Sequence, residues 1–326
     1  MIDCVKKISL FNRDKAKIKK KVLIIGRGRW SKIILSELDS NFPNLKNIFV
    51  FSPSFKTNEK KLNRKIVYIN SLQLISKEKI TYVIIANKNS GHLRYIKLFL
   101  KKECHILCEK PLTITKKKLI NLTSKINKKK NSVSISMQYF YAFYLNFINR
   151  NFIKNKIIER ITIDWFDIKN EKRGGFIKKH DLKLNFIEDI FYHFYSILYL
   201  LIGIKEYTFQ NKPIKIKKIV QLKFNSNKKT KIILNSSRSE VRRRRIVRIY
   251  FNNKDRIFLD FSKDTSLNVK FNEKKLKIPF QFMNKTLKYQ LFFFLKQKIN
   301  VKNKELNSLK NLEIFFKNMY ILKKKL

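Results

Sequence analysis

The sequence contains little cysteine, glycine, proline or alanine. Among 326 residues there are six Gly, five Pro and three Cys. Cys104 and Cys108 flank one apolar run, and with only Cys4 left there is no second pair to complete a metal site. We therefore expect free, partly buried thiols, a reducing cytoplasmic compartment and no bound metal.

Long apolar runs are also missing. The longest apolar stretch, from Phe186 to Ile204, is interrupted by Glu188, Asp189 and His193. A membrane-spanning helix needs about 20 predominantly apolar residues, and the N-terminal stretch has no apolar segment long enough for a secretory signal. The sequence therefore predicts a protein without a membrane partner.

Acidic residues are scarce, with 23 Asp and Glu against 75 Lys and Arg, so the formal net charge is +52. One interpretation is a polyanionic partner, because clustered basic residues contact phosphates. The other is an AT-rich genome, since Lys, Ile, Asn and Phe abound while Gly, Pro and Ala are rare. The even spread of lysines favours the second, and we expect no specific nucleic-acid partner. For the densest cluster, Arg242 to Arg245, a solvated strand end is favoured over a phosphate site.

The first half of the chain alternates short apolar runs with helical patterns. This alternation is typical of parallel βαβ units and predicts a doubly wound sheet. The expected strands are 21–25, 47–51, 65–69, 82–86 and 105–108, and the expected helices are 30–38, 72–76, 91–101 and 115–128. Residues 1–20 are basic and weakly periodic, which suits an extension.

The second half has a different pattern. Strand-like runs follow one another at short spacing, which favours an antiparallel sheet. The expected strands are 132–137, 157–166, 215–224, 231–235, 245–251, 256–261 and 267–271, and the expected helices are 186–201, 287–298 and 306–322. We predict an α/β protein: a basic extension (1–20), a Rossmann domain with a doubly wound parallel sheet (21–130), and an α+β domain with a mainly antiparallel sheet for substrate binding and oligomerisation (131–326).

The segment GRGRWS, from Gly26 to Ser31, follows the first strand and opens a helix. Gly26 would allow a tight turn, and Gly28 would let the backbone approach a pyrophosphate at the helix N-terminus. Ser31 replaces the third glycine of the dinucleotide-binding fingerprint. The order of strand, glycines and helix favours a dinucleotide site over an ordinary strand–helix turn. The predicted cofactor-binding residues of this segment are Gly26, Gly28, Arg29, Trp30 and Ser31.

No acidic residue follows the second strand. An NAD site usually places Asp or Glu there to hold the ribose 2′-hydroxyl. Here residues 49–56 read FVFSPSFK, with Ser52, Ser54 and Lys56, and Arg27 lies in the neighbouring turn. Hydroxyl and cationic groups suit a 2′-phosphate, whereas the alternative is a plain loop. We expect NADP or NAD as cofactor, with NADP preferred.

Two further strand ends carry a paired motif: residues 83–92 read VIIANKNSGH and residues 104–112 read CHILCEKPL. Together they resemble the Gfo/Idh/MocA oxidoreductases, of the glucose–fructose oxidoreductase and inositol dehydrogenase type. In that family a strand ends near Thr-Pro, a His follows on the next helix, and Glu-Lys-Pro follows the next strand. Asn87 and Lys88 replace Thr-Pro here. The resemblance implies cofactor contacts by Asn87, His92, Glu109 and Lys110.

Lys110 is also a candidate catalytic residue, because a lysine beside a cofactor can polarise a substrate hydroxyl or carbonyl. A second match lies in the other half, where residues 189–193 read DIFYH and resemble the family's Asp-x-Gly-x-His helix. Four-residue spacing places Asp189 and His193 on one helix face. His193 is the candidate general base, and Asp189 binds substrate or orients the site. Phe191 replaces the family's glycine.

The resemblance implies an NAD(P)-dependent oxidoreductase that transfers a hydride to or from a sugar, polyol or nucleotide-sugar-like substrate. A homo-oligomer is implied by the resemblance alone. Two alternatives stay open: an imine or keto reductase of a biosynthetic pathway, and a degenerate, non-catalytic nucleotide-binding protein. We predict that Lys110, Asp189 and His193 meet in one pocket between the domains.

Overall fold

The computed structural model divides into two compact units, each defined by the contacts among its own residues. It describes residues 2–56, 65–112, 115–128, 132–169, 172–173, 176–177, 186–203, 206–210, 212–216, 218–226, 230–263, 266–279, 286–297, 308 and 312–325. The first unit comprises Ile2–Tyr141 and Lys285–Glu313, and the second comprises Ala142–Asn284 and Ile314–Leu326. Each unit therefore contains chain from both halves of the sequence.

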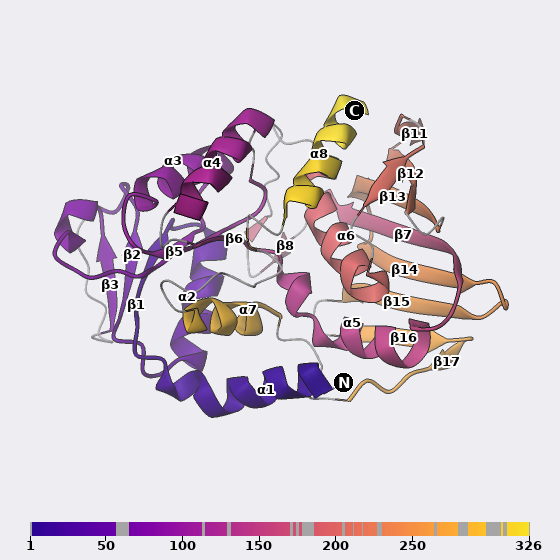
Figure 1. Ribbon diagram of the computed structural model, residues 1–326, viewed down its shortest axis with the longest axis horizontal. Helices are drawn as coiled ribbons and strands as arrows, with labels where there is room; N and C mark the ends of the chain where they lie inside the picture. The colour runs from indigo at the N-terminus through magenta and orange to yellow at the C-terminus, as the bar shows by residue number, and fades with distance from the viewer. Residues whose placement is uncertain are drawn as a thin grey trace. The chain divides into compact units, whose positions relative to one another are not determined.

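A six-stranded, wholly parallel sheet forms the centre of the first unit (Figure 1). Its strands are β1 (Lys21–Ile25), β2 (Asn47–Phe51), β3 (Ile66–Ile69), β4 (Tyr82–Ile85), β5 (His105–Cys108) and β6 (Ser132–Ile135). The order β3-β2-β1-β4-β5-β6 is that of a doubly wound dinucleotide-binding sheet. The order of the strands reverses between β1 and β4, and in such sheets ligands bind at this point.

Helices cover both faces of this sheet. They are α1 (Ile2–Asp14), α2 (Arg29–Asn41), α3 (Asn89–Phe99), α4 (Lys116–Lys128) and α7 (Thr286–Lys296), with short 3-10 turns at η1 (Lys15–Lys17), η2 (Leu72–Ile75) and η3 (Gln138–Tyr141). Right-handed crossovers place α2 on one face and α3 and α4 on the other. The four central strands are almost fully buried, as continuous apolar runs in a covered parallel sheet require.

The N-terminal segment is a helix packed on the first unit, and the prediction of an extension over residues 1–20 is corrected. Phe11 of α1 is fully buried, and its ring centroid lies 5.3 Å from that of Tyr289 and 5.2 Å from that of Phe292 on α7. Lys296 of α7 also donates to Asp14 at 2.5 Å. Burial of aromatic rings at this junction ties two distant segments of chain together.

The contact-based division also differs from the predicted domain boundary at residues 130 and 131. Strand β6 completes the first sheet by pairing with β5, and η3 follows it in the same unit. Helix α7 belongs to the first unit as well. Its Gln290 accepts a hydrogen bond from Ser136, which follows β6, and Gln297, which follows α7, accepts one from Ser132 of β6. The return of the chain to the first unit is fixed by these contacts, which have no local signature.

The second unit is built on a mixed nine-stranded sheet with the order β10-β12-β13-β7-β14-β15-β16-β17, in which β11 pairs with β12. The strands are β7 (Ile158–Ile168), β10 (Tyr207–Phe209), β11 (Ile214–Ile216), β12 (Ile219–Ser226), β13 (Lys231–Glu240), β14 (Arg244–Phe251), β15 (Arg256–Lys263), β16 (Ser266–Phe271) and β17 (Lys274–Lys275). Short strands β8 (Lys172–Arg173) and β9 (Phe176–Ile177) form a separate hairpin. The expected antiparallel pairing is confirmed except between β7 and β13, which are parallel.

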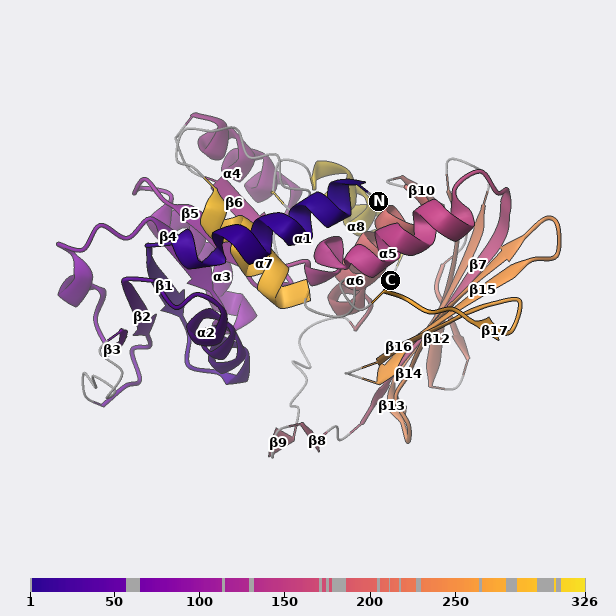
Figure 2. The same ribbon diagram turned by 90° about the horizontal axis from the view of Figure 1, so that it is seen from below.

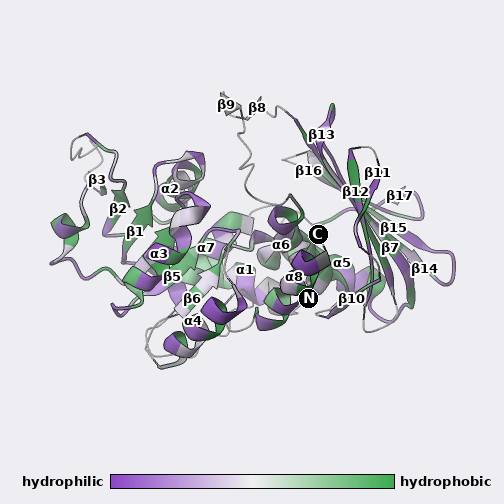
Figure 3. Ribbon diagram, turned by 90° about the horizontal axis from the view of Figure 1, so that it is seen from above, coloured by the Kyte–Doolittle hydropathy of each residue, from purple (hydrophilic) through white to green (hydrophobic). Residues whose placement is uncertain are grey.

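Helices α5 (Phe143–Ile148), α6 (Phe186–Ile202) and α8 (Glu313–Lys325), with the π-helical turn η4 (Asn149–Ile153), complete the second unit (Figure 2). Trp165 of β7 contacts Phe194 of α6, and Phe191 of α6 stacks on Phe315 of α8. These aromatic contacts form a core between the sheet and its helices. Figure 3 colours the ribbon by hydropathy and shows hydrophobic residues in green on strands of both sheets. Among the described residues, no helix is long and apolar enough to cross a membrane.

Candidate functional site

The turn after β1 can be built only with glycine. Gly26 has φ of +125°, a conformation that side chains rarely adopt. A Cβ atom there would lie 2.7 Å from the carbonyl oxygen of Ala86 and 2.8 Å from Ser31 Oγ. The Gly26 N–H donates to Phe51 O at 2.9 Å, so the turn is held against the ends of both neighbouring strands.

The N-terminus of α2 is open at Gly28. This residue is the N-cap, with φ −70° and ψ 175°, and a Cβ atom there would meet nothing within 4 Å. Neither a capping side chain nor an acidic residue occupies the first turn of the 13-residue helix. The positive end of the helix dipole and unpaired N–H groups therefore face an open space that suits a phosphate.

Ser31 and Trp30 take different places in this turn. Ser31 is buried, and its hydroxyl donates to Ala86 O at 3.1 Å, so it packs the helix against β4. Trp30 is half-buried and its Nε1 has no hydrogen-bond partner. Arg29 is exposed at the first helical position. The backbone of Gly26 to Arg29 is therefore the part of the motif that a dinucleotide can reach.

The loop after β2 combines hydroxyl groups with a guanidinium. Ser52 Oγ and Ser54 Oγ lie 2.9 Å apart, and Arg27 Nη1 donates to Ser54 O at 3.1 Å. Arg27 and Lys56 are exposed, whereas Ser52 is buried. The arrangement places an arginine across the strand end where the sequence analysis expects the adenosine ribose.

His92 is a bridge inside the protein. Its side chain is buried on α3, with Nε2 3.1 Å from Asn87 O and Nδ1 3.2 Å from Pro111 O. Burial lowers its pKa, so the neutral ring is favoured and donates to one carbonyl at a time. Both ring nitrogens face backbone, and His92 joins the β4 end to the segment that carries Lys110. Its predicted cofactor contact stays a prediction.

Asn87 packs against α3. A Cβ atom on Gly91 would lie 2.1 Å from Asn87 Nδ2, so Gly91 makes room for this side chain. Asn87 Oδ1 is buried without a hydrogen-bond partner. Asn87 follows β4 next to the Gly26 turn, because Ala86 N–H donates to Ile25 O at 2.8 Å.

Glu109 and Lys110 follow β5 on the same edge of the sheet. Glu109 is buried, and burial raises the pKa of its carboxyl to about 7, against the opposing effects of Ser136, Trp30 and Lys110. Its Oε1 has no partner at hydrogen-bond distance. Lys110 is half-buried and precedes Pro111 through a cis peptide bond. The edge thus presents a carboxyl that is largely neutral below pH 7 beside an amine.

In the second unit, Asp189 lies in the first turn of α6 and is bound by an arginine. Arg238 Nη2 of β13 donates to Asp189 Oδ2 at 2.5 Å. His193 is half-buried on the same helix and stacks on Trp165, with ring centroids 5.5 Å apart and an angle of 20° between the ring planes. The expected helix and spacing are confirmed, and Arg238 and Trp165 join the candidate site.

A second arginine, Arg245, contacts the same tryptophan, and for this residue the prediction of a solvated strand end is wrong. Arg245 has a side chain only 12% exposed, and its Nη2 donates to the buried Asp167 Oδ1 at 2.6 Å. Its guanidinium also lies over the Trp165 ring, 4.6 Å from the centroid. Arg242 and Arg244 are exposed. In a chain with 75 basic residues, no local signal distinguishes Arg238 or Arg245 from solvated ones.

The two halves of the candidate site lie in different units. Lys110 belongs to the first and Asp189 and His193 to the second, so their meeting on one substrate stays a prediction. His180 lies outside the described residues. Of the described residues, no group of three or more His, Cys, Asp or Glu could hold a metal.

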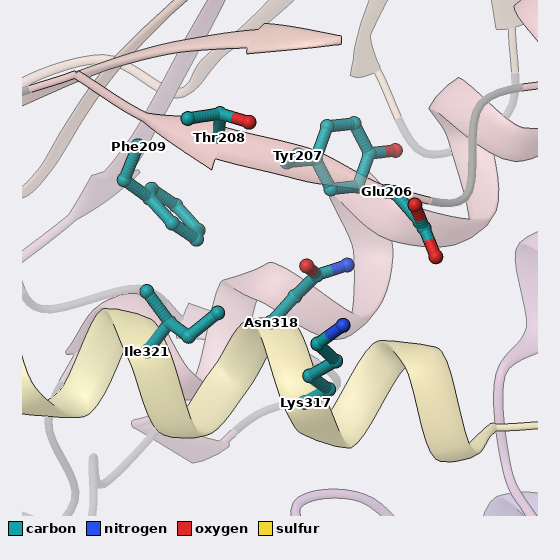
Figure 4. A pocket seen from close by; sticks show the side chains of 7 residues that line it. All are labelled: Glu206, Tyr207, Thr208, Phe209, Lys317, Asn318 and Ile321. Carbon is teal, nitrogen blue, oxygen red and sulfur yellow. The ribbon is translucent and has the colours of Figure 1, made fainter. Parts of the chain in front are cut away.

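A pocket of about 290 Å³ lies elsewhere in the second unit, between β10 and α8 (Figure 4). Glu206, Tyr207 and Phe209 line it from the strand, and Lys317, Asn318 and Ile321 line it from the helix. None of the predicted site residues contributes to it. We therefore base the functional assignment on the sheet edge of the first unit.

Comparisons with known proteins agree with this architecture. The Gfo/Idh/MocA family model, described as an oxidoreductase family with an NAD-binding Rossmann fold, matches residues 20–137. A search of the curated proteins gives no match. The resemblance found in the sequence and the predicted fold class are both confirmed.

Solved structures share the fold over most of the chain. A myo-inositol dehydrogenase from Corynebacterium glutamicum is 14% identical, with a TM-score of 0.66, over 94% of this chain and 96% of that one. A UDP-N-acetylglucosamine 3-dehydrogenase from Acidithiobacillus ferrooxidans is 15% identical, with a TM-score of 0.65, over 85% and 88%. A 3-ketoreductase from Actinomadura kijaniata, solved with NADP and TDP-benzene, is 13% identical, with a TM-score of 0.66, over 85% and 89%.

Proposed function

Because residues 20–137 form the NAD-binding Rossmann domain of the Gfo/Idh/MocA oxidoreductase family, we propose that this chain transfers a hydride between NADP and a CH–OH or C=O carbon of a sugar, polyol or nucleotide sugar. The observation that carries the proposal is the edge of the first sheet. There, an open glycine turn at Gly28 follows β1, and Glu109 and Lys110 follow β5 at the same edge, with β4 between the two strands.

The first unit fits a dinucleotide. The open N-terminus of α2, with room at Gly28, suits the pyrophosphate. The adenosine ribose belongs at the β2 end, where Ser54 and the Arg27 guanidinium favour a 2′-phosphate over a bare hydroxyl. When bound, NADP supplies or accepts the hydride, and the protein provides orientation and charge.

Lys110 and His193 then have separate roles at the substrate oxygen. Lys110 donates a hydrogen bond to the reacting oxygen, which stabilises negative charge as it develops there. During oxidation His193 accepts the hydroxyl proton, and during reduction it returns this proton. Asp189, held by Arg238, orients the substrate or the site.

A second candidate function is nucleotide binding without catalysis. Two observations favour it: Arg238 occupies the Asp189 carboxylate, and the fully buried Phe191 fills the family's glycine position. An imine or keto reductase differs from the main proposal only in its substrate. Hydride transfer separates the two classes, because both would bind cofactor.

Calorimetric titration with NADP, NADPH, NAD and NADH tests the cofactor proposal. We expect NADP(H) to bind more tightly than NAD(H), and an Arg27→Ser variant to lose most of this difference, because the guanidinium faces the 2′-phosphate. Lys212→Ser in the second unit serves as the charge-matched control. Failure of all four nucleotides to bind at millimolar concentration would overturn the proposal, and equal binding would remove the preference for NADP.

A further inference from the structure

Four polar side chains from separate elements meet behind the sheet edge of the first unit. They are Trp30 of α2, Glu109 after β5, Ser136 after β6 and Gln290 of α7. Gln290 is fully buried, and Ser136 and Glu109 are 3% and 9% exposed. Ser136 and Gln290 are hydrogen-bonded at 3.1 Å between Oγ and Oε1, although 154 positions separate them in the sequence. We call these four residues the Glu109 cluster.

The cluster holds more hydrogen-bonding atoms than it satisfies. Trp30 Nε1, Glu109 Oε1 and Gln290 Nε2 are buried and have no hydrogen-bond partner among the described residues. Buried polar atoms normally find partners, and three that lack them around one carboxyl need an explanation. Trp30 and Ser136 nevertheless lie close enough to the carboxyl to lower its pKa against the effect of burial.

The positions of the hydrogen-bonding protons in the cluster supply the explanation. Ser136 has a single hydroxyl proton, which it donates to Gln290 Oε1 in the described arrangement. Its oxygen can then bond to Glu109 only by accepting the proton of a neutral carboxyl. When Glu109 is ionised, the Ser136 proton must turn to the carboxylate. Gln290 must then present Nε2 to Ser136 Oγ, which a half-turn of its amide achieves.

We infer that Gln290 is a positioning residue: through Ser136 it holds the Glu109 carboxyl beside Lys110, and its amide reverses when Glu109 releases or takes up a proton. The proton released by Glu109 passes to solvent water, and no bond between heavy atoms changes. Each of the two states then satisfies the Ser136 hydroxyl completely. One state uses the Gln290 oxygen and the other uses its nitrogen.

The charges around Glu109 set where this change occurs. Among the described residues, Lys110 is the charged group that acts on Glu109, and its charge lowers the pKa of the carboxyl. The adjacent Cys108 thiol has its own pKa raised by burial and by Glu109. The other neighbouring elements contribute only uncharged groups: Trp30 from α2, Ser136 from the segment after β6, and Gln290 from α7. Burial outweighs the favourable contacts and raises the pKa of Glu109 to about 7.

The consequence for catalysis rests on the proposed function. An ionised Glu109 places negative charge next to Lys110 and so fixes this side chain by a charge-assisted contact, which orients its hydrogen bond to the reacting oxygen. The rate of hydride transfer should therefore rise as Glu109 ionises, and Gln290 should set the pH at which this happens.

The direct test is a titration of the cofactor-free protein by NMR with glutamate labelled at the side-chain carboxyl carbon. The Glu109 resonance is assigned by its loss in Glu109→Gln. In Ser136→Ala and Gln290→Met, the ionised carboxylate loses its donor or the support of that donor. Because charge-assisted bonds are the stronger ones, we expect both variants to raise the midpoint by about one pH unit, a tenfold change in the ionisation equilibrium.

The chain offers a matched control. Gln297 accepts a hydrogen bond from Ser132 Oγ at 3.0 Å at the opposite end of β6, so Gln297→Met makes the same chemical change far from Glu109. We expect it to leave the Glu109 midpoint unchanged. If Gln290→Met and Gln297→Met gave the same midpoint as the wild type, the inference would be overturned. Should Gln290→Met fail to fold, Gln290→Glu keeps the shape and must raise the midpoint further by like-charge repulsion.

Catalysis is measured separately. The pH profile of kcat/KM for NADPH oxidation should shift by the same amount as the NMR midpoint in Gln290→Met, and not at all in Gln297→Met. An unchanged profile in Gln290→Met would contradict the link to Lys110. If the NMR midpoint shifts but no variant and no wild type oxidises NADPH, the cluster stands and the proposed function fails.

Discussion

Two sets of buried carboxyl groups, Asp164 and Asp167 in the second unit and Glu109 in the first, are held in opposite ways. In the second unit, Asp164 and Asp167 are each bound by an arginine, at 2.8 and 2.6 Å. In the first unit, Glu109 has no arginine partner among the described residues, and its neighbours are the uncharged Trp30 and Ser136 and the adjacent Lys110. The chain has a net charge of +52 and therefore many more cationic side chains than carboxylates. That no arginine pairs with Glu109 among the described residues is therefore a property of this site.

The difference indicates the role of each kind of carboxyl group. A paired buried carboxylate stays charged and fixes the strands that carry it, because separating the pair would leave a buried charge alone. A buried carboxyl without an arginine gives up its charge more easily, and it can change protonation state near neutral pH. The first arrangement fixes the sheet of the second unit, and the second arrangement suits a site where a proton is released or taken up.

The largest effect is expected where a buried pair is broken. Arg245→Met should cost about 3–5 kcal/mol, because Asp167 would lose its arginine while remaining buried. Arg256→Met is the matched control: its pair with Glu273 is more than half exposed on both sides, and such pairs are worth less than about 1 kcal/mol. Urea denaturation measures both, and equal losses would show that burial does not distinguish the two pairs.

A smaller effect of opposite sign is expected at Glu109. Its pKa rises on folding from the ordinary 4.5 to about 7, so its contribution to stability is complete below pH 4.5 and is lost as the pH rises through 7. Glu109→Gln removes this penalty and should therefore stabilise the protein by roughly 3 kcal/mol at pH 8, with no gain at pH 4.5.

Asp255 provides the contrast for that measurement. Hydrogen bonds from Lys156, Asn272 and Asn253 lower its pKa to about 2, so its contribution is present above pH 3.8 and is lost as the pH falls. Asp255→Asn should therefore destabilise the protein at pH 8. If thermal melts at pH 8 showed the same sign for both variants, the distinction between the two kinds of carboxyl would fail.

The glycine turn after β1 allows a similar comparison between two backbone positions, Gly26 and Gly28. Gly26→Ala should destabilise the first unit by about 2 kcal/mol, because φ is +125° and the new Cβ meets Ala86 O at 2.7 Å. Gly28→Ala should leave stability within about 0.5 kcal/mol, because nothing lies within 4 Å of its Cβ position. Chemical denaturation of the two variants checks this, and a large loss in Gly28→Ala would show that the turn is closed.

The smallest effect is expected at His92. His92→Leu removes the donor that a buried carbonyl of Asn87 or Pro111 uses, which should cost about 1 kcal/mol. Because the ring joins the segments that carry Asn87 and Lys110, we expect kcat to fall while KM for the cofactor stays nearly constant. A fall in cofactor affinity with kcat intact would instead support a direct contact.

Sequence patterns predicted the first sheet well because its strands are short apolar runs separated by helices. Such runs are buried on both faces, and burial leaves a continuous hydrophobic signal. The signals at Gly26, Gly28 and the Glu109–Lys110 pair are equally local. The turn needs glycine for steric reasons that act within a few residues, so a single sequence reveals it.

The parts that could not be predicted depend on contacts between distant residues. Helix α1 has a weak pattern of its own, and its position is set by Phe11 against α7. Ser136 and Gln290 are ordinary polar residues until the fold brings them together. Arg238 gives no signal among 75 basic residues, because its partner Asp189 lies 49 positions away. These are tertiary effects, and no window of sequence contains both partners.

The most direct test of the account is hydride transfer itself. NADPH carrying deuterium at the transferable position of C4 is incubated with the protein and keto derivatives of hexoses, inositols and nucleotide sugars, and the products are analysed by mass spectrometry. We predict deuterium in one alcohol product, with a rate about 10² to 10⁴ lower in His193→Gln and a similar loss in Lys110→Met. Cofactor binding without deuterium transfer to any substrate would contradict the account and leave a non-catalytic nucleotide-binding protein.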